Sequence, residues 1–149
     1  MKTQLIRVNK TFHFEAAHAL DGYDGKCKDI HGHSYVLKVT VLGKPSSDSS
    51  QSSCGMVIDF GDIKKIVKSE ILPLFDHVLV LRTDSRFKGL EKLNDKVRYV
   101  DYQPTCENML QEIVAIIKIK FTTKQYKLHS VFLQETHSSS AEWFASDNL

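Results

Sequence analysis

The sequence has little cysteine, no long apolar run and almost no excess of charge. Its three cysteines, Cys27, Cys54 and Cys106, are odd in number and follow no regular spacing, which predicts reduced thiols instead of a disulfide framework. No stretch approaches the roughly 20 apolar residues that a membrane-spanning helix needs. Residues 1–8 also lack the apolar core of a signal peptide. These absences lead us to expect a cytoplasmic protein without membrane contacts.

The charge balance argues against a nucleic-acid partner. The net charge is only +2, and no run of lysine and arginine is interleaved with aromatic residues. A local basic group is better explained as a site for a phosphorylated small molecule. With 149 residues, of which 42% are hydrophobic, the chain is long enough to bury a core as a single domain over residues 1–149. The serine-rich residues 46–53 are expected to form a surface excursion within that domain.

Two periodicities alternate along the chain. Apolar residues recur at every second position in the predicted strands and at helical spacing in two predicted helices. The strands are expected at residues 5–20, 34–42, 56–58, 97–102, 126–136 and 141–144. One helix is expected to begin near Asp59 or Asp62 and to end at Pro73, and the second to run from Thr105 to Phe121. This order predicts an α+β fold, an antiparallel four-stranded sheet with two helices on one face.

Three histidines are predicted to meet at one end of the first two strands. His31 and His33 are two residues apart, so on a strand both imidazoles project from the same face. The apolar even-numbered positions of the preceding strand lead to His18, which comes level with that pair if the two strands form an antiparallel hairpin. Three neutral imidazoles with an open fourth position are typical of a catalytic zinc ion. The spacing therefore predicts a zinc site at His18, His31 and His33.

Two other interpretations of these residues stay open. Cys27 lies four residues before His31, and its thiolate would close the tetrahedron of a structural zinc site if it were a fourth ligand. His13 falls on the opposite face of the first strand, where a histidine is more often an ordinary polar residue than a ligand.

Acidic side chains further along the chain also suggest chemistry. Asp76 precedes His77 where two elements join, and a carboxylate beside an imidazole can orient and charge the ring for acid–base work. The pair is weak evidence by itself, since an aspartate in a turn beside a surface histidine is common. Glu135 continues the apolar row of Val131 and Leu133, where a carboxylate needs hydrogen-bond donors. Its separation along the chain from the histidines argues against a role as a metal ligand.

Six short motifs, taken in order, resemble the 6-pyruvoyl-tetrahydropterin synthase and 6-carboxytetrahydropterin synthase family. They are Phe14-Glu15-Ala16-Ala17-His18, Cys27 before His31-Gly32-His33, Met56-Val57-Ile58-Asp59-Phe60, Asp76-His77, Pro104-Thr105-Cys106-Glu107-Asn108 and Glu135-Thr136. Each motif is modest, but the ordered set is highly specific, and the resemblance extends over residues 12–143.

The resemblance implies a role for most of these residues. In this family the three histidines hold a zinc ion that chelates the side-chain hydroxyls of dihydroneopterin triphosphate. Cys27 would act as a base, Asp76 and His77 would move protons, and Glu135 would anchor the pterin ring. The fold would be the tunnelling fold, or T-fold, in which the sheets of several subunits join into a barrel. The oligomer would be a homohexamer built as a dimer of trimers.

The fifth motif is less decisive than the others. Thr105 and Glu107 are candidates for substrate binding, the glutamate from a neighbouring subunit. Each also has a structural explanation, Thr105 as a helix N-cap and Glu107 as a first-turn acid that the helix dipole favours. Cys106 stands where the family usually has a small serine or alanine.

The family has two branches, and both expel triphosphate. One keeps the carbon chain and makes 6-pyruvoyltetrahydropterin. The other also cleaves the chain, releasing acetaldehyde and leaving 6-carboxytetrahydropterin on the way to queuosine. Three residues separate Cys27 from His31, a spacing that resembles the carboxy branch. A non-catalytic zinc- and pterin-binding protein is the alternative of another class, and the joint presence of Cys27, His77 and Glu135 argues against it.

Overall fold

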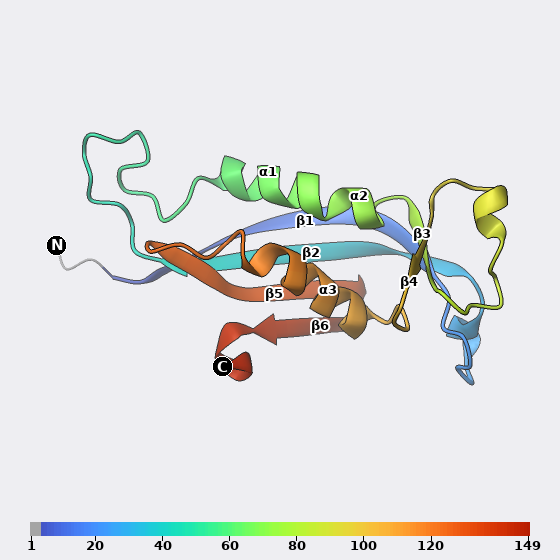
Figure 1. The fold of residues 1–149 in the computed structure, drawn as a ribbon. Coiled ribbons are helices and arrows are strands. Elements are labelled where there is room, and N and C mark those ends of the chain that lie inside the picture. Colours follow the sequence, from blue (N-terminus) through green and yellow to red (C-terminus); the bar gives the residue numbers. More distant parts are fainter. Residues whose placement is uncertain (1–3) are drawn as a thin grey trace.

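A single curved sheet forms the centre of the molecule (Figure 1). The computed structural model describes residues 4–149. The strands are β1 (Ile6–His18), β2 (His31–Gly43), β3 (Val78–Arg82), β4 (Val97–Val100), β5 (Tyr126–Thr136) and β6 (Ser139–Phe144). They form one six-stranded sheet in the order β4-β3-β1-β2-β5-β6. The strands β1, β2, β5 and β6 pair with one another in antiparallel fashion, as predicted, whereas β3 pairs with β1, and β4 with β3, in parallel.

The predicted strand at residues 56–58 is wrong, because this segment does not pair with the sheet. Val57 and Ile58 are nevertheless buried, which accounts for the apolar pattern. The side-chain amide of Gln125 donates to the carbonyls of Met56 and Val57 at 3.1 and 3.3 Å. A side chain therefore satisfies backbone acceptors that a neighbouring strand would otherwise pair.

Strands β1 and β2 form the long hairpin that the sequence predicts. Its register pairs Phe14 with Tyr35, Ala16 with His33 and His18 with His31. Paired residues of an antiparallel ladder project from the same face, so the apolar row of each strand ends in histidine. Phe14 and Tyr35 stack with ring centroids 5.1 Å apart directly beneath that end.

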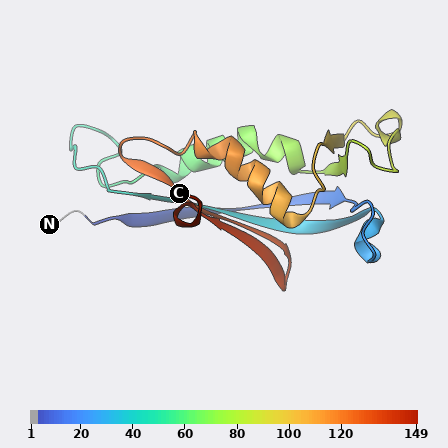
Figure 2. The ribbon, with the colours of Figure 1, turned by 60° about the horizontal axis from the view of Figure 1, so that its bottom comes forward.

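The helices form one layer that covers one face of the sheet (Figure 2). Helix α1 (Phe60–Glu70) is capped by Asp59, whose Oδ1 accepts from the Gly61 amide at 2.6 Å. Pro73 lies in the first turn of the short helix α2 (Leu72–Phe75), where its missing N–H costs no hydrogen bond. Helix α3 (Cys106–Lys118) is capped by Thr105 and buries its apolar stripe against the sheet.

Connecting segments gather at the two ends of the sheet. The 3₁₀ turns Lys26–Lys28 and Leu90–Lys92 lie at the end where β1 stops and β2 begins, and a third turn, Ala145–Asn148, follows β6 (Figure 1). The serine-rich segment forms an exposed loop at the opposite end, as predicted. Among residues 4–149, no helix is both long and apolar enough to cross a membrane.

Candidate active site

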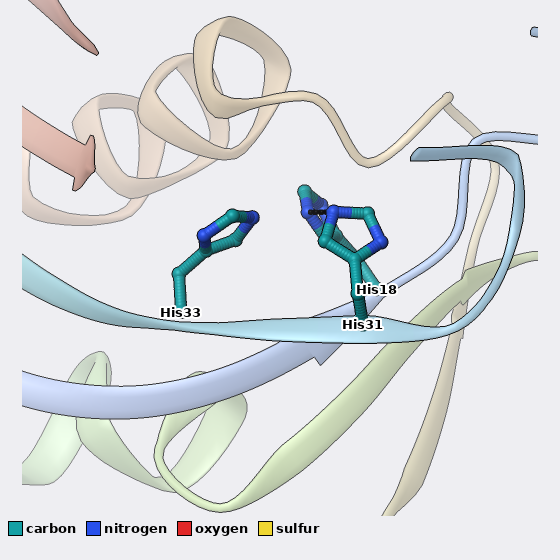
Figure 3. A group of neighbouring side chains, drawn as sticks. All are labelled: His18, His31 and His33. Atoms are coloured by element: carbon teal, nitrogen blue, oxygen red, sulfur yellow. Dashed lines mark hydrogen bonds between the residues drawn. The ribbon is translucent and has the colours of Figure 1, made fainter. Parts of the chain in front are cut away.

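His18, His31 and His33 converge at the end of the β1–β2 hairpin (Figure 3). One ring nitrogen from each histidine lies within 4.8 Å of the other two, a geometry that could hold a metal ion. The Nε2 atoms of His18 and His31 are only 3.0 Å apart. The hairpin register produces this cluster, because it sets the last residue of β1 opposite the first residue of β2.

Backbone carbonyls fix the orientation of two of these rings. The Nδ1 atom of His18 donates to the Pro104 carbonyl at 2.6 Å, and the Nδ1 atom of His31 donates to the Asp29 carbonyl at 2.8 Å. A carbonyl can only accept, so in the neutral rings Nδ1 carries the proton and Nε2 presents a lone pair. Two lone pairs that face each other repel unless a cation lies between them. Histidines that bind metals are held by this kind of outer hydrogen bond.

His33 completes the donor set. Its Nε2 atom is buried and has no hydrogen-bond partner within residues 4–149. Burial lowers the pKa of His33 and of His18 below the usual value, and the neighbouring imidazoles lower it further. Both rings are therefore neutral near pH 7, the form that binds metals. The donor set fits a metal ion held by three nitrogens.

Glu135 lies beside the histidines in space, although it is distant from them in the sequence. Its Oε1 atom is 3.6 Å from Nε2 of His18 and 3.9 Å from Nε2 of His33. The same oxygen accepts a hydrogen bond from the Tyr35 hydroxyl at 3.1 Å. Burial and the Glu135 charge raise the pKa of Tyr35, which keeps its proton available for this bond. Separation in sequence was therefore a poor guide to the distance between Glu135 and the histidines.

Tyr35 is a residue of the site that the sequence reasoning did not identify. It is almost fully buried, at 1% exposure, and it follows His33 by two positions on the same face of β2. The signal was its place in the histidine row, since any residue two positions along a strand shares the face. Its aromatic character suggested only a core residue, and it does stack in the core on Phe14.

A cavity of about 310 Å³ opens beside the cluster. It brings together five of the residues predicted from the sequence: His18, Cys27, Thr105, Glu107 and Glu135. The Thr105 hydroxyl also accepts from the Asn108 amide at 3.3 Å, so its N-cap role is confirmed. This cavity contains a thiol, carboxylates and imidazoles around a space large enough for a small molecule.

Cys106 also lines this cavity but differs from Cys27 in its surroundings. Its thiol is buried and donates to the Leu133 carbonyl at 3.4 Å. Burial, together with the charges of Glu135 and Glu107, raises the pKa of Cys106 to about 12. Cys106 therefore remains protonated and fills space, while the half-buried Cys27 is the accessible thiol of the cavity.

Asp76 and His77 do not line that cavity. The Oδ1 atom of Asp76 accepts from the Glu15 amide at 3.1 Å and lies 2.9 Å from Nδ1 of His77. His77 opens into a separate hollow of about 380 Å³, which also includes Glu15 and Ser34. Glu15 and Ser34 alternate with the buried row and so face the other side of the sheet, whereas His33, which also lines this hollow, belongs to that row. Within one chain, the predicted acid–base pair is apart from Cys27.

Comparisons with known proteins identify the family of this chain. Residues 7–145 match the family described as 6-pyruvoyl tetrahydropterin synthase. The chain belongs to this family. As a member of the 6-pyruvoyl tetrahydropterin synthase family, it is 36% identical over 144 residues to the 6-carboxy-5,6,7,8-tetrahydropterin synthase of Haemophilus influenzae, covering 93% of this chain and 99% of that protein. The enzyme of the same name from Rickettsia typhi is 33% identical over 142 residues, with the same coverage.

The fold of the family is also present. The structure of Caenorhabditis elegans 6-pyruvoyl tetrahydropterin synthase matches this chain with a TM-score of 0.66 at 23% sequence identity. The match covers 97% of this chain and 99% of that one. The predicted α+β T-fold is therefore confirmed, although the sheet has six strands instead of the four expected.

Proposed function

We propose that this protein is a zinc-dependent lyase acting on 7,8-dihydroneopterin triphosphate. The reaction would consume one water and give 6-carboxy-5,6,7,8-tetrahydropterin, acetaldehyde and triphosphate. The observation that carries this proposal is the set of three imidazole nitrogens beside a cavity that also contains Cys27 and Glu135. The carboxy product is favoured over the pyruvoyl product by the three-residue spacer before His31 and by the names of the curated relatives.

His18, His31 and His33 would hold the zinc ion, with the Asp29 and Pro104 carbonyls fixing two of the rings. Bound zinc would act as a Lewis acid that makes the hydroxyls and adjacent carbons of the substrate side chain more acidic. Three protein ligands leave a coordination position for those hydroxyls, as in other catalytic zinc sites.

The remaining residues of the cavity would bind the substrate and move its protons. Cys27 would remove a proton from the side chain of the substrate, because it is the accessible thiol of the cavity. Glu135 would bind the N–H edge of the pterin ring, with Tyr35 holding one carboxylate oxygen in place. Thr105 and Glu107 would contact the substrate from the start of α3.

We predict that Glu135 determines affinity for the pterin. Replacing it by glutamine keeps the shape but puts an N–H donor where an acceptor oxygen faces a ring N–H. Loss of such a charge-assisted pair typically costs about 2–4 kcal/mol, or roughly 30- to 1000-fold in kcat/KM. Steady-state kinetics of Glu135→Gln measure this, with the exposed Glu142→Gln on β6 as a control for loss of charge. Parent-like kinetics in Glu135→Gln would remove the anchor role.

A homo-oligomer would complete the site. His77 lines a hollow that does not include Cys27, and Asp76 lies beside its ring, so the pair would serve the cavity of a neighbouring copy. The outer strands β4 and β6 have edges that no strand of residues 4–149 pairs, and such edges need a partner. Joining sheets from several copies into a barrel would supply one, in a hexamer built from trimers.

Light scattering at micromolar concentration tests the assembly directly. We expect a mass several times the 17.0 kDa of one chain, and a hexamer is the specific expectation. A monomeric mass would contradict the proposal, because it would leave Asp76 and His77 away from every thiol cavity.

Incubation with dihydroneopterin triphosphate tests the reaction itself. We expect 6-carboxytetrahydropterin by mass spectrometry and acetaldehyde by an alcohol dehydrogenase assay. Triphosphate release with 6-pyruvoyltetrahydropterin and no acetaldehyde would establish the other branch. Binding of the pterin without any product would indicate a non-catalytic protein and refute the proposed activity.

A further inference from the structure

The loop between β1 and β2 carries Cys27 and leads directly into His31, yet it lacks apolar anchors. None of residues 20–30 is buried. A loop without buried apolar side chains gains little from the hydrophobic effect, so its position depends on polar contacts. Among the described residues, the backbone hydrogen bonds within this loop are those of short turns and one bond from the Leu20 amide to the Cys27 carbonyl, at 2.9 Å.

Arg86 binds this loop from the segment between β3 and β4. One guanidinium nitrogen, Nη2, donates to the Lys28 carbonyl at 2.8 Å and to Oδ1 of Asp29 at 2.6 Å. The Arg86 backbone amide donates to Oδ1 of Asp21 at 3.2 Å, and its Nε lies 3.8 Å from the same oxygen. Arg86 therefore holds both the first and the last part of the loop.

These contacts involve residues next to Cys27 and His31 in the candidate site. Lys28 follows Cys27, so the bond to its carbonyl fixes the backbone next to the thiol. Asp29 is paired with Arg86 through its side chain and holds Nδ1 of His31 through its carbonyl. Arg86 thus restrains both Lys28, which adjoins the thiol residue, and Asp29, whose carbonyl orients the His31 ring.

Gln103 supports the same loop from a third segment. Its side-chain amide donates to the Asp21 carbonyl at 2.8 Å, next to Pro104, whose carbonyl orients His18. The loop is therefore held between the segments that precede α3 and follow β3. Of these contacts, the Arg86 side chain makes those nearest to Cys27 and His31.

We propose that Arg86 is a positioning residue that holds Cys27 and His31 in their working geometry. Arginine suits this role because its planar fork can bind a carbonyl and a carboxylate together. The effect on the thiol rests on the proposed function, whereas the effect on His31 concerns metal binding alone. Arg86 has no place in the cavity lining, so it would act through the loop and not on the substrate.

The variant Arg86→Gln tests the proposal, with Arg82→Gln as the matched control. Arg82 pairs only with Asp84 among the described residues and makes no bond to the loop. In metal-free Arg86→Gln we expect faster amide hydrogen exchange confined to residues 20–31. Zinc affinity, measured by chelator competition, should fall about 10-fold, and kcat should fall roughly 10- to 100-fold with KM within about threefold. Arg82→Gln should match the parent in hydrogen exchange, in zinc affinity and in kinetics.

Two further variants separate positioning from a general loss of stability. Asp29→Asn combined with Arg86→Gln should weaken zinc binding no more than the stronger single change, because both act through one contact. Arg86→Lys should recover part of the zinc affinity, since it keeps the charge but not the fork. Additive losses in the double variant would overturn the proposal, as would parent-like exchange and zinc affinity in Arg86→Gln. If exchange and affinity change as expected but even the parent forms no product, the role of Arg86 stands and the proposed reaction fails.

Discussion

Replacing Cys27 by alanine is expected to remove most product formation while the metal stays bound. A missing general base typically costs about 10²- to 10⁴-fold in rate. The zinc content should not change, because the donor set of three histidines is complete without the thiol. Turnover of dihydroneopterin triphosphate and elemental analysis of the same sample measure both quantities.

The other two cysteines supply the controls for that experiment. Cys54 is exposed and directly follows the serine-rich residues 46–53, so Cys54→Ser should leave turnover unchanged. Cys106→Ser tests the buried thiol in the cavity and should change rate far less than Cys27→Ala does. Loss of zinc together with the Cys27 thiol would establish the structural-zinc interpretation instead.

Replacing His31 by alanine is expected to remove both the metal and the activity. The change leaves two histidine ligands and abolishes the bond between Nδ1 and the Asp29 carbonyl. Loss of an outer-shell partner alone typically weakens metal binding about 10- to 100-fold, so loss of a ligand should weaken it by at least 100-fold. Elemental analysis after dialysis against a weak chelator measures the zinc that remains.

His13 offers a matched control on the same hairpin. It is exposed and falls on the face of β1 opposite to His18. His13→Ala should therefore keep the zinc content of the parent. Undiminished zinc in His31→Ala would remove this histidine from the metal site.

The hairpin and its histidines could be predicted because the period of a strand is local information. Once His18 ends the even-numbered row and His31 begins the next strand, antiparallel pairing requires the two rings to meet. The N-caps Asp59 and Thr105 were equally local, since each cap bonds an amide two or three residues ahead.

Other parts of the site depend on contacts that no local pattern contains. The orientation of His18 comes from the Pro104 carbonyl, 86 residues away in the sequence, and a carbonyl leaves no mark in the residue types. The bond between Tyr35 and Glu135 likewise joins two strands across the β2–β5 pairing. Which of several acidic residues reaches the histidines is fixed by that pairing and not by spacing.

The parallel pairing of β3 with β1 likewise could not be predicted from local patterns in the sequence. The sequence shows only that Val78 is apolar and does not show which strand it pairs with. Its pairing with Ala16 of β1 sets the position of the adjacent His77. The roles predicted for Asp76 and His77 depend in turn on the neighbouring copy of the proposed oligomer.

Zinc titration of the metal-stripped protein, with acetaldehyde release as the signal, tests the central claim most directly. It joins the three-histidine site to the proposed reaction in one measurement. We predict no acetaldehyde from dihydroneopterin triphosphate without zinc, and a linear rise that stops near one zinc per chain. Full acetaldehyde release by the metal-stripped protein, or none at any zinc concentration, would contradict the account.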